Sequence, residues 1–445
     1  MQPGTPLELK DHQARAVSRI TQEMRGRCLL AHEMGLGKTL TSLAVVRHYG
    51  GPVLVVAPAG NRDLWAAEAE KCGVGPFQVF VRAPKDPGFA WPDFCIVAYE
   101  LLIKDATLQR KKWNLLVCDE AHSIKNLRPS AKLSSKRSLR VLELAWTVPH
   151  LLLLTGTPQL SRAFELYPLL HAVSKGAFGT MHEFADRYAC GATDAAGRWA
   201  ARGSTNLPEL YARMQPYVDR ILKKDVLDLP DKQRTKVFLE LSPEDTALLA
   251  GMAAQLAALK AQASKSSWKS MEADAYLQQC YRESSTRKIP HILQWLGAVA
   301  KDGEPLVVFA HHHVVLDALE AYFRDAGLRY GRVDGTTTPK KRAEVIAALT
   351  SGELLYGVLS LTSCGTGITL SPFHYRVAFA ELQWNPGMFL QAEDRVHRIN
   401  TTRPVFIYYL IARGSLDDMM FGLLSAKSAR NAAAVDDAPS SFVFT

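Results

Sequence analysis

The chain alternates short apolar runs with longer stretches of mixed polar and apolar residues. In the first half, five runs of four or five apolar residues each precede a polar or glycine-containing turn; they cover residues 28–31, 53–57, 94–98, 115–118 and 151–154. Such continuous runs are typical of strands buried on both faces of a parallel sheet with crossover helices. The pattern returns at residues 305–310, 357–360, 376–380 and 405–410. We therefore predict an α/β protein with two parallel sheets.

The strand pattern fades between the two blocks. Helix-forming residues dominate from about 160 to 290, and residues 246–263 are predicted to form a helix. Leu229-Pro230-Asp231 is typical of a break between domains. We predict a first lobe over 1–225 with a helical insertion at about 159–225, a linker and helical protrusion over 226–290, a second lobe over 291–425 and a frayed tail over 426–445.

Composition narrows the class of protein only slightly. The 445 residues include 53 Lys and Arg against 44 Asp and Glu, and the net charge of +9 favours a polyanionic partner. Seven cysteines without a C-x-x-C pair argue against a zinc module or disulfide framework. No apolar run approaches the roughly 18 residues of a membrane span. We expect a monomer that binds neither a membrane nor zinc. We also expect an intracellular location, cytoplasmic in a bacterium or phage and nuclear in a eukaryote.

A phosphate-binding loop is predicted directly after the first strand. Residues 32–39 read His-Glu-Met-Gly-Leu-Gly-Lys-Thr, and a helical stretch follows. Small residues let backbone N–H groups face phosphates, and the helix N-terminus adds its dipole. Lys38 would pair with the β- and γ-phosphates, and the Thr39 hydroxyl would ligate Mg²⁺. His32 stands where the full phosphate-loop motif has glycine.

Two further polar segments follow buried strands. Asp119 and Glu120 come directly after residues 115–118, where one carboxylate can hold Mg²⁺ and the other can polarise the attacking water. Thr155-Gly156-Thr157-Pro158 follows residues 151–154 and suits a sensor of the γ-phosphate. A solvated acidic turn and a plain strand-ending turn are the alternative interpretations.

A distant glutamine–arginine segment predicts a partner for this loop. Gln391, Arg395 and Arg398 are spaced i, i+4 and i+7, which would place them on one helix face. Arginines supplied from outside a phosphate loop stabilise the transferring phosphoryl group. A basic surface stripe is the competing interpretation. The run His311-His312-His313 is predicted to be a loop with polar contacts, because three consecutive residues cannot converge on one metal ion.

In this order, the segments resemble the Swi/Snf-type DNA-dependent ATPases of helicase superfamily two, over about residues 7–425. The resemblance is carried by residues 9–13, 32–39, 119–122, 153–158, 333–336, 361–368 and 391–398. Residues 308–312, 379–387 and 391–399, with 184–188 and 206–210, are similar to the annealing-helicase (fork-remodelling) branch. The sequence departs from the family at His32, where Asp is usual, at His12, where an aromatic residue is usual, and at Asn400-Thr401.

The resemblance implies two RecA-like lobes and an ATPase that moves on double-stranded or branched DNA. It implies that Gln13 reads adenine and that residues 32–39 (His32, Glu33, Met34, Gly35, Leu36, Gly37, Lys38 and Thr39) bind Mg·ATP. Asp119 and Thr39 would hold Mg²⁺, Glu120 would activate water, and Gln391, Arg395 and Arg398 would complete the site. DNA phosphates would be contacted near Pro58, Ala59, Tyr99, Thr336, Thr362, Trp384 and Asn385.

Two other functions are compatible with these motifs. A strand-separating DNA or RNA helicase shares them and would unwind a plain duplex. A non-catalytic clamp would bind nucleotide and DNA without turnover, and the departures at His32 and Asn400 are the residues that favour it.

Overall fold

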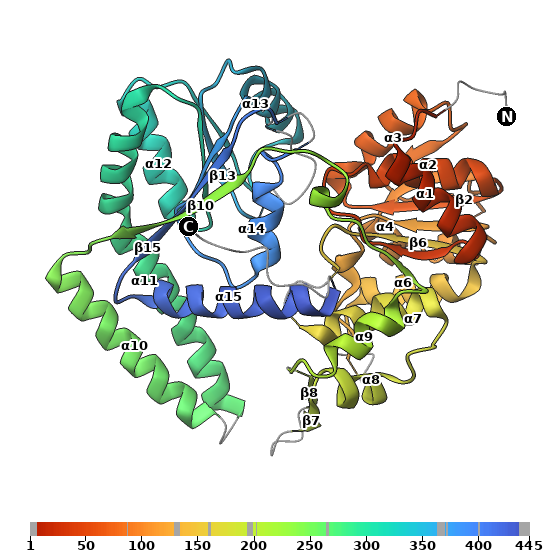
Figure 1. Ribbon diagram of the computed structural model, residues 1–445, viewed down its shortest axis with the longest axis horizontal. Coiled ribbons are helices and arrows are strands. Elements are labelled where there is room, and N and C mark those ends of the chain that lie inside the picture. The colour runs from red at the N-terminus through yellow and green to blue at the C-terminus, as the bar shows by residue number, and fades with distance from the viewer. Residues whose placement is uncertain are drawn as a thin grey trace. The chain divides into compact units, whose positions relative to one another are not determined.

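The computed structural model describes residues 7–86, 88–128, 134–158, 162–193, 199–201, 203–263, 267–362, 370, 373–398 and 401–435. Contacts within the chain define two compact units (Figure 1). The first consists mainly of Met1–Ala192 and Trp199–Leu227, and the second mainly of Asp228–Ala429. Residues 363–368 and Asn400, from two of the motifs above, lie outside the described residues.

A seven-stranded parallel sheet forms the centre of the first unit. Its strands, in spatial order, are β3 (Gln78–Phe80), β4 (Phe94–Ala98), β2 (Val53–Ala57), β5 (Leu115–Cys118), β6 (His150–Leu154), β1 (Arg27–Leu30) and β9 (Val218–Asp219). Every described pairing is parallel. All five strands predicted in the first half are confirmed. β3 and β9 were not predicted, because each has only two or three residues.

Alternate residues of these strands enter two different cores, which explains the continuous apolar runs. Leu29, Leu54 and Leu116 face one core, while Cys28, Val53 and Val117 face the other. The helices are α1 (Asp11–Ser18), α2 (Lys38–Tyr49), α3 (Arg62–Lys71), α4 (Tyr99–Lys104), α5 (Thr107–Arg110), α6 (Lys136–Thr147), α7 (Tyr167–Ser174), α8 (Met181–Tyr188) and α9 (Leu207–Met214). Helices α1 to α3 contribute to the second core, and α4, α6 and α7 to the first.

Residues 159–225 were predicted to be a helical insertion, but they also contain strands. Besides η5 (Ala163–Leu166), α7, α8, α9 and η6 (Lys223–Asp225), they include a two-stranded sheet of β7 (Gly191–Thr193) and β8 (Trp199–Ala201). They also include β9, which pairs with β1 and so belongs to the main sheet. The segment therefore returns to the sheet before the chain leaves the first unit.

A six-stranded parallel sheet forms the centre of the second unit. Its order is β10 (Lys232–Leu239), β15 (Val405–Ala412), β14 (Arg376–Phe379), β11 (Leu306–Ala310), β13 (Tyr356–Ser360) and β12 (Tyr330–Val333). The helices are α10 (Pro243–Ala263), α11 (Ser267–Val299), α12 (His313–Asp325), α13 (Pro339–Ser351), α14 (Pro386–Glu393) and α15 (Leu416–Val435), with a short turn η7 (Ala300–Asp302). The four strands and the helix over 246–263 predicted in this half are confirmed.

Two boundaries of the predicted domain scheme were wrong. The second sheet does not begin after residue 290, because β10 lies inside the predicted linker and pairs with β15 along its whole length. β10 is an edge strand with several exposed polar residues, so it lacks an apolar run. The predicted tail also does not begin at 426, since α15 continues to Val435 and its residue Leu424 packs in the core.

A buried ionic network joins β10 to the end of α14. Arg234 donates to both carboxylate oxygens of Glu393, at 2.8 and 2.6 Å, and the Tyr409 hydroxyl donates to the same group at 2.8 Å. Lys232 pairs with Asp394 at 2.8 Å. Burial alone would raise the pKa of Glu393, but the charges of Arg234 and Lys232 lower it. The network compensates a fully buried carboxylate and fixes the chain just before Arg395.

Replacing Arg234 by Met should destabilise the second unit by about 3–5 kcal/mol, because it leaves Glu393 as a weakly compensated buried charge. The measurement is urea unfolding of Arg234→Met beside Gln233→Met, a change at an exposed neighbour on the same strand. Equal shifts of the two variants would show that the network adds nothing to stability.

Candidate functional site

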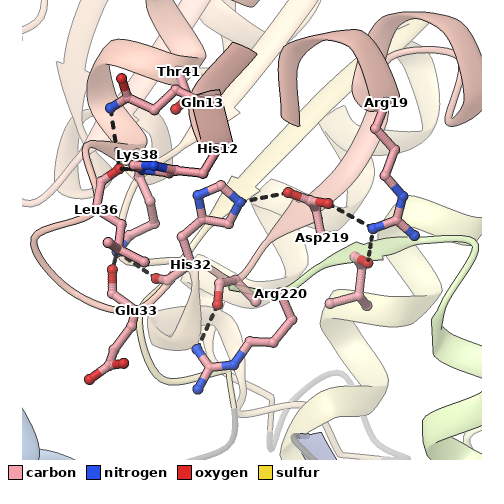
Figure 2. Close-up of polar contacts among 12 residues, drawn as sticks. His12, Gln13, Arg19, His32, Glu33, Leu36, Lys38, Thr41, Asp219 and Arg220 are labelled. Carbon is pink, nitrogen blue, oxygen red and sulfur yellow. Dashed lines mark hydrogen bonds and ion pairs between the residues drawn. The ribbon is translucent and has the colours of Figure 1, made fainter. Parts of the chain in front are cut away.

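The predicted phosphate-binding loop, residues 32–39, connects β1 to α2 and includes the first two residues of α2. α2 begins at Lys38, with Gly37 as its N-cap. Gly35 and Gly37 have φ values of 86° and 74°, a region that favours glycine. The Lys38 Nζ donates to the carbonyls of His32 at 2.9 Å and Glu33 at 3.3 Å. The loop therefore curls around its own lysine, which is the arrangement that a phosphate-binding loop needs (Figure 2).

The N-terminal helix contacts the crest of this loop. His12 Nε2 and Gln13 Nε2 lie 3.1 and 3.3 Å from the Leu36 carbonyl oxygen (Figure 2). A Cβ on Gly37 would come within 2.1 Å of Gln13 Nε2, so a larger residue would displace the Gln13 amide from the loop. Both side chains are buried. Gln13, assigned above to adenine, thus also contacts the loop that would carry the phosphates.

The two predicted carboxylates follow β5. Asp119 Oδ2 accepts from Asn61 Nδ2 at 3.0 Å and from Trp65 Nε1 at 3.1 Å, while Oδ1 accepts from the Glu120 N–H at 2.9 Å. Burial, followed by the charge of Glu120, raises the pKa of Asp119. Two neighbouring carboxylates with this penalty gain from a divalent cation. The carboxylate of Asp119 is therefore suited to holding a divalent cation such as Mg²⁺.

Glu120 has a left-handed backbone, with φ 49° and ψ 49°. This conformation is uncommon for a residue with a side chain and is found at functional sites. The Glu120 Oε2 lies 3.2 Å from His122 Nδ1, which also lies 3.2 Å from Thr155 Oγ1. His122 thus joins the acidic segment to the threonine segment. It stands in the acidic motif, yet sequence reasoning assigned it no role.

The threonine segment after β6 touches the phosphate-binding loop. A Cβ on Gly156 would come within 2.5 Å of Met34 Cγ and 3.5 Å of Lys38 Nζ. Arg220 donates to the Gly156 carbonyl at 3.2 Å and to the Ala31 carbonyl at 2.6 Å. Because β5, β6 and β1 are neighbours in the sheet, the three predicted motifs meet at one edge.

The glutamine–arginine segment belongs to the second unit and departs from the prediction. α14 ends at Glu393, so only Gln391 is helical, and Arg395 and Arg398 follow in turns. The three residues therefore do not share one helix face. The peptide N–H groups of Val396 and His397 both donate to the Glu393 carbonyl, so the chain continues past the helix end in tight turns.

Both arginines are largely enclosed by the second unit. Arg395 is 3% exposed, and Arg398 donates from Nε to the Asp394 carbonyl at 2.9 Å. Burial, followed by the charge of Arg395, lowers the pKa of Arg398 to about 10. Two guanidinium groups held in this way favour a nearby anion.

His311 and His312 form a loop with polar contacts, as predicted, whereas His313 begins α12. The N–H groups of His311 and His312 donate to Glu381 Oε2, at 2.6 and 2.9 Å, and His312 Nδ1 lies 2.6 Å from Glu381 Oε1. Tyr281 stacks on the His311 ring. The contacts join the carboxyl ends of β11 and β14.

Of the residues predicted to contact DNA, Tyr99 does not fit. Its side chain is 1% exposed, and its hydroxyl donates to the Asp119 carbonyl at 2.7 Å. It supports the acidic segment instead. Ala59, Thr336 and Thr362 are exposed; Pro58, Trp384 and Asn385 are half-buried. Asn385 also caps α14 by accepting from the Gly387 N–H.

No helix among the described residues is long and apolar enough to cross a membrane. The SNF2-related domain matches residues 12–286, and the helicase conserved C-terminal domain matches residues 287–400.

Three known proteins illustrate the likeness. The SWI/SNF-related matrix-associated actin-dependent regulator of chromatin subfamily A-like protein 1 of Xenopus tropicalis is 34% identical over 410 residues, covering 90% of this chain and 42% of that protein. The DNA annealing helicase and endonuclease ZRANB3 of Bos taurus is 31% identical over 430 residues, covering 91% and 38%. The solved Sulfolobus solfataricus SWI2/SNF2 ATPase core in complex with dsDNA has a TM-score of 0.45 and 25% identity, covering 94% and 91%.

The chain thus spans less than half the length of these two relatives. The SNF2-related domain alone covers more than half of the chain. Its range includes the predicted phosphate-binding loop, the acidic segment and the threonine segment. The chain belongs to the SNF2-related family of helicase-like ATPases.

Proposed function

We propose that the protein hydrolyses Mg·ATP and uses the reaction to move on double-stranded or branched DNA. The observation that carries the proposal is the meeting of three motifs at the ends of β1, β5 and β6. A lysine for phosphate, a carboxylate pair and a threonine that shares His122 with Glu120 are the parts that phosphoryl transfer to water requires.

Each residue has a distinct role in the proposed reaction. Lys38 leaves the carbonyls of His32 and Glu33 and pairs with the β- and γ-phosphates. Thr39 and Asp119 hold Mg²⁺, which neutralises phosphate charge when it is bound. Glu120 orients and polarises the attacking water, and His122 fixes the carboxylate of Glu120 relative to Thr155. Gln13 would read adenine above the loop.

Arg395 and Arg398 are proposed to complete the reaction from the second unit. The sequence of that unit has no Gly-Lys-Thr segment like that of residues 37–39. The anion that the two arginines contact would therefore be the γ-phosphate held by the first unit. The local charge of two neighbouring arginines supports this role, since an anion would relieve their repulsion. DNA that favours the catalytic arrangement would then stimulate hydrolysis.

Strand annealing and fork remodelling are the finer proposal. It is supported by the likeness to a protein named as a DNA annealing helicase, of which this chain spans 38%. The separating experiment measures ATPase activity with no DNA, single-stranded, double-stranded and forked DNA, together with unwinding of a plain duplex. A strand-separating helicase would unwind the duplex, and a clamp would bind ATP without turnover under all four conditions.

Replacing Glu120 by Gln should preserve ATP binding and lower turnover by about 10²–10⁴-fold, because the amide keeps the shape but cannot polarise water as a carboxylate does. The measurement is steady-state ATPase activity with an ATP-binding titration. Glu143→Gln, a change at an exposed residue of α6 in the same unit, is the control. Normal turnover by Glu120→Gln would remove Glu120 from the mechanism.

Double-stranded DNA should accelerate ATP hydrolysis, and the stimulation should weaken as salt rises, because phosphate contacts release counterions. The measurement is turnover against DNA concentration at several salt concentrations, with RNA of equal length as the control. Equal rates with and without DNA at low salt, or stimulation by RNA alone, would contradict the proposal.

Replacing Arg395 or Arg398 by Ala should reduce DNA-stimulated turnover by about 10³-fold. Because the two side chains are enclosed, alanine should also lower the melting temperature, so the Lys variants are the sharper test. Lysine keeps the charge but lacks the planar fork, and it should restore stability more than activity. Arg413→Lys, at an exposed arginine of the same unit, is the control. If the loss of activity tracks the loss of stability in all four variants, the arginines are structural.

A further inference from the structure

A buried three-residue network lies under the phosphate-binding loop. The His32 side chain is 0% exposed, and its Nε2 lies 2.6 Å from Asp219 Oδ2. The other oxygen of Asp219 accepts from Arg19 at 2.7 Å. Figure 2 shows the three side chains in a row, with the carboxylate between the imidazole and the guanidinium. None of them contacts Asp119, Glu120 or Thr155 in the described hydrogen bonds and ion pairs.

Burial acts in opposite directions on the pKa of His32 and the pKa of Asp219. Burial lowers the pKa of His32, although the hydrogen bond to Asp219 acts in the opposite direction. Burial alone would raise the pKa of Asp219, but the hydrogen bond from His32 and the charge of Arg19 lower it overall. Arg19 supplies the compensating charge. Its hydrogen bonds to the carbonyls of Val218 and Gln215 hold it against the segment that carries Asp219.

The segment around Asp219 runs beside the start of the loop and is hydrogen-bonded to it at successive positions. The Ala31 N–H donates to the Asp219 carbonyl at 2.8 Å, and the Glu33 N–H donates to the Ile221 carbonyl at 2.9 Å. The Lys223 N–H then donates to the Glu33 side chain at 2.7 Å. The parallel pairing of β1 with β9 therefore continues on both sides of His32, and the His32–Asp219 contact lies within it.

The network also reaches the helix that covers the loop. Arg19 begins η1 (Arg19–Glu23), which continues α1 without a break. The same helix places His12 and Gln13 on the Leu36 carbonyl. His32 fixes the start of the loop and α1 covers its crest, and both are tied to one carboxylate. The loop can keep its shape only if both attachments keep their spacing.

We propose that His32, Asp219 and Arg19 are positioning residues for the nucleotide. They hold the first residue of the phosphate-binding loop at a set distance from the helix that carries Gln13, so that backbone N–H groups and Lys38 face the phosphates before ATP arrives. The inference rests on the proposed ATPase function and adds to it the residues that set affinity. Because the carboxylates of the chemical step are not in this network, it governs ATP affinity and leaves the step at saturating ATP nearly unchanged.

The test compares four variants of the full chain: Asp219→Ala, His32→Leu, the double variant and His32→Gln. Affinity is measured with a non-hydrolysable ATP analogue, and KM and kcat are measured with ATP and saturating DNA. Asp219→Ala and His32→Leu should each raise Kd and KM about 10-fold, with kcat within about threefold of the parent. The double variant should lose no more than either single one. His32→Gln keeps an N–H toward Asp219 and should restore most of the affinity.

The control is Asp302→Ala in the second unit. Asp302 pairs with Arg376 at 2.7 Å beside the amino ends of β11 and β14, and its own side chain is half-exposed. Melting temperatures of all variants separate lost affinity from lost fold. If Asp219→Ala does not fold, His32→Leu with its rescue variant His32→Gln carries the test.

Unchanged Kd and KM in the folded variants would overturn the inference. So would additive losses, a fall in kcat at unchanged KM, or an equal effect of Asp302→Ala. If the parent chain itself binds no ATP analogue, the proposed function fails. If the parent binds and the variants bind equally well, only the positioning role fails.

Discussion

Parallel pairing brings the carboxyl ends of all strands in a sheet to the same edge, and the chemistry of the first unit depends on this constraint. Three motifs that are far apart in the chain come together only because β5, β6 and β1 are adjacent and point the same way. Were β1 reversed or moved to the sheet's edge, Lys38 would lie away from Asp119 and Gly156. The two cores on opposite faces hold that strand order in place.

Buried charges do a second kind of positioning in both units. Glu393 fixes the end of α14 through Arg234 and Tyr409, and Asp219 fixes the start of the phosphate-binding loop through His32. In each case a carboxylate with a desolvation penalty is useful only while its partners stay within hydrogen-bonding distance. Such contacts tolerate less movement than apolar packing, which suits residues that must hold a loop or a turn in one shape.

The sequence pattern predicted the elements whose structure depends on neighbouring residues in the chain. The apolar runs identified nine strands, among them β2, β4 and β5 with their observed bounds, because each is buried on both faces. In the two main sheets they missed β3, β9, β10 and β12; β10 is a polar edge strand and β9 has only two residues. The spacing of Gln391, Arg395 and Arg398 indicated a helix, but Arg234, more than 150 positions away, bonds the residue at which the helix ends. Likewise nothing near His32 pointed to Asp219, which reaches it through pairing of β9 with β1.

The backbone at Glu120 has a consequence for how this protein can change over time. Its left-handed conformation is one that glycine adopts freely and glutamate adopts at a cost of about 1–2 kcal/mol. The position proposed to carry the carboxylate that polarises water is therefore also one where glycine would relieve backbone strain. At this position a substitution by glycine would favour stability and remove the carboxylate needed for the proposed turnover. Selection for ATP hydrolysis would therefore oppose a substitution that stability alone would favour.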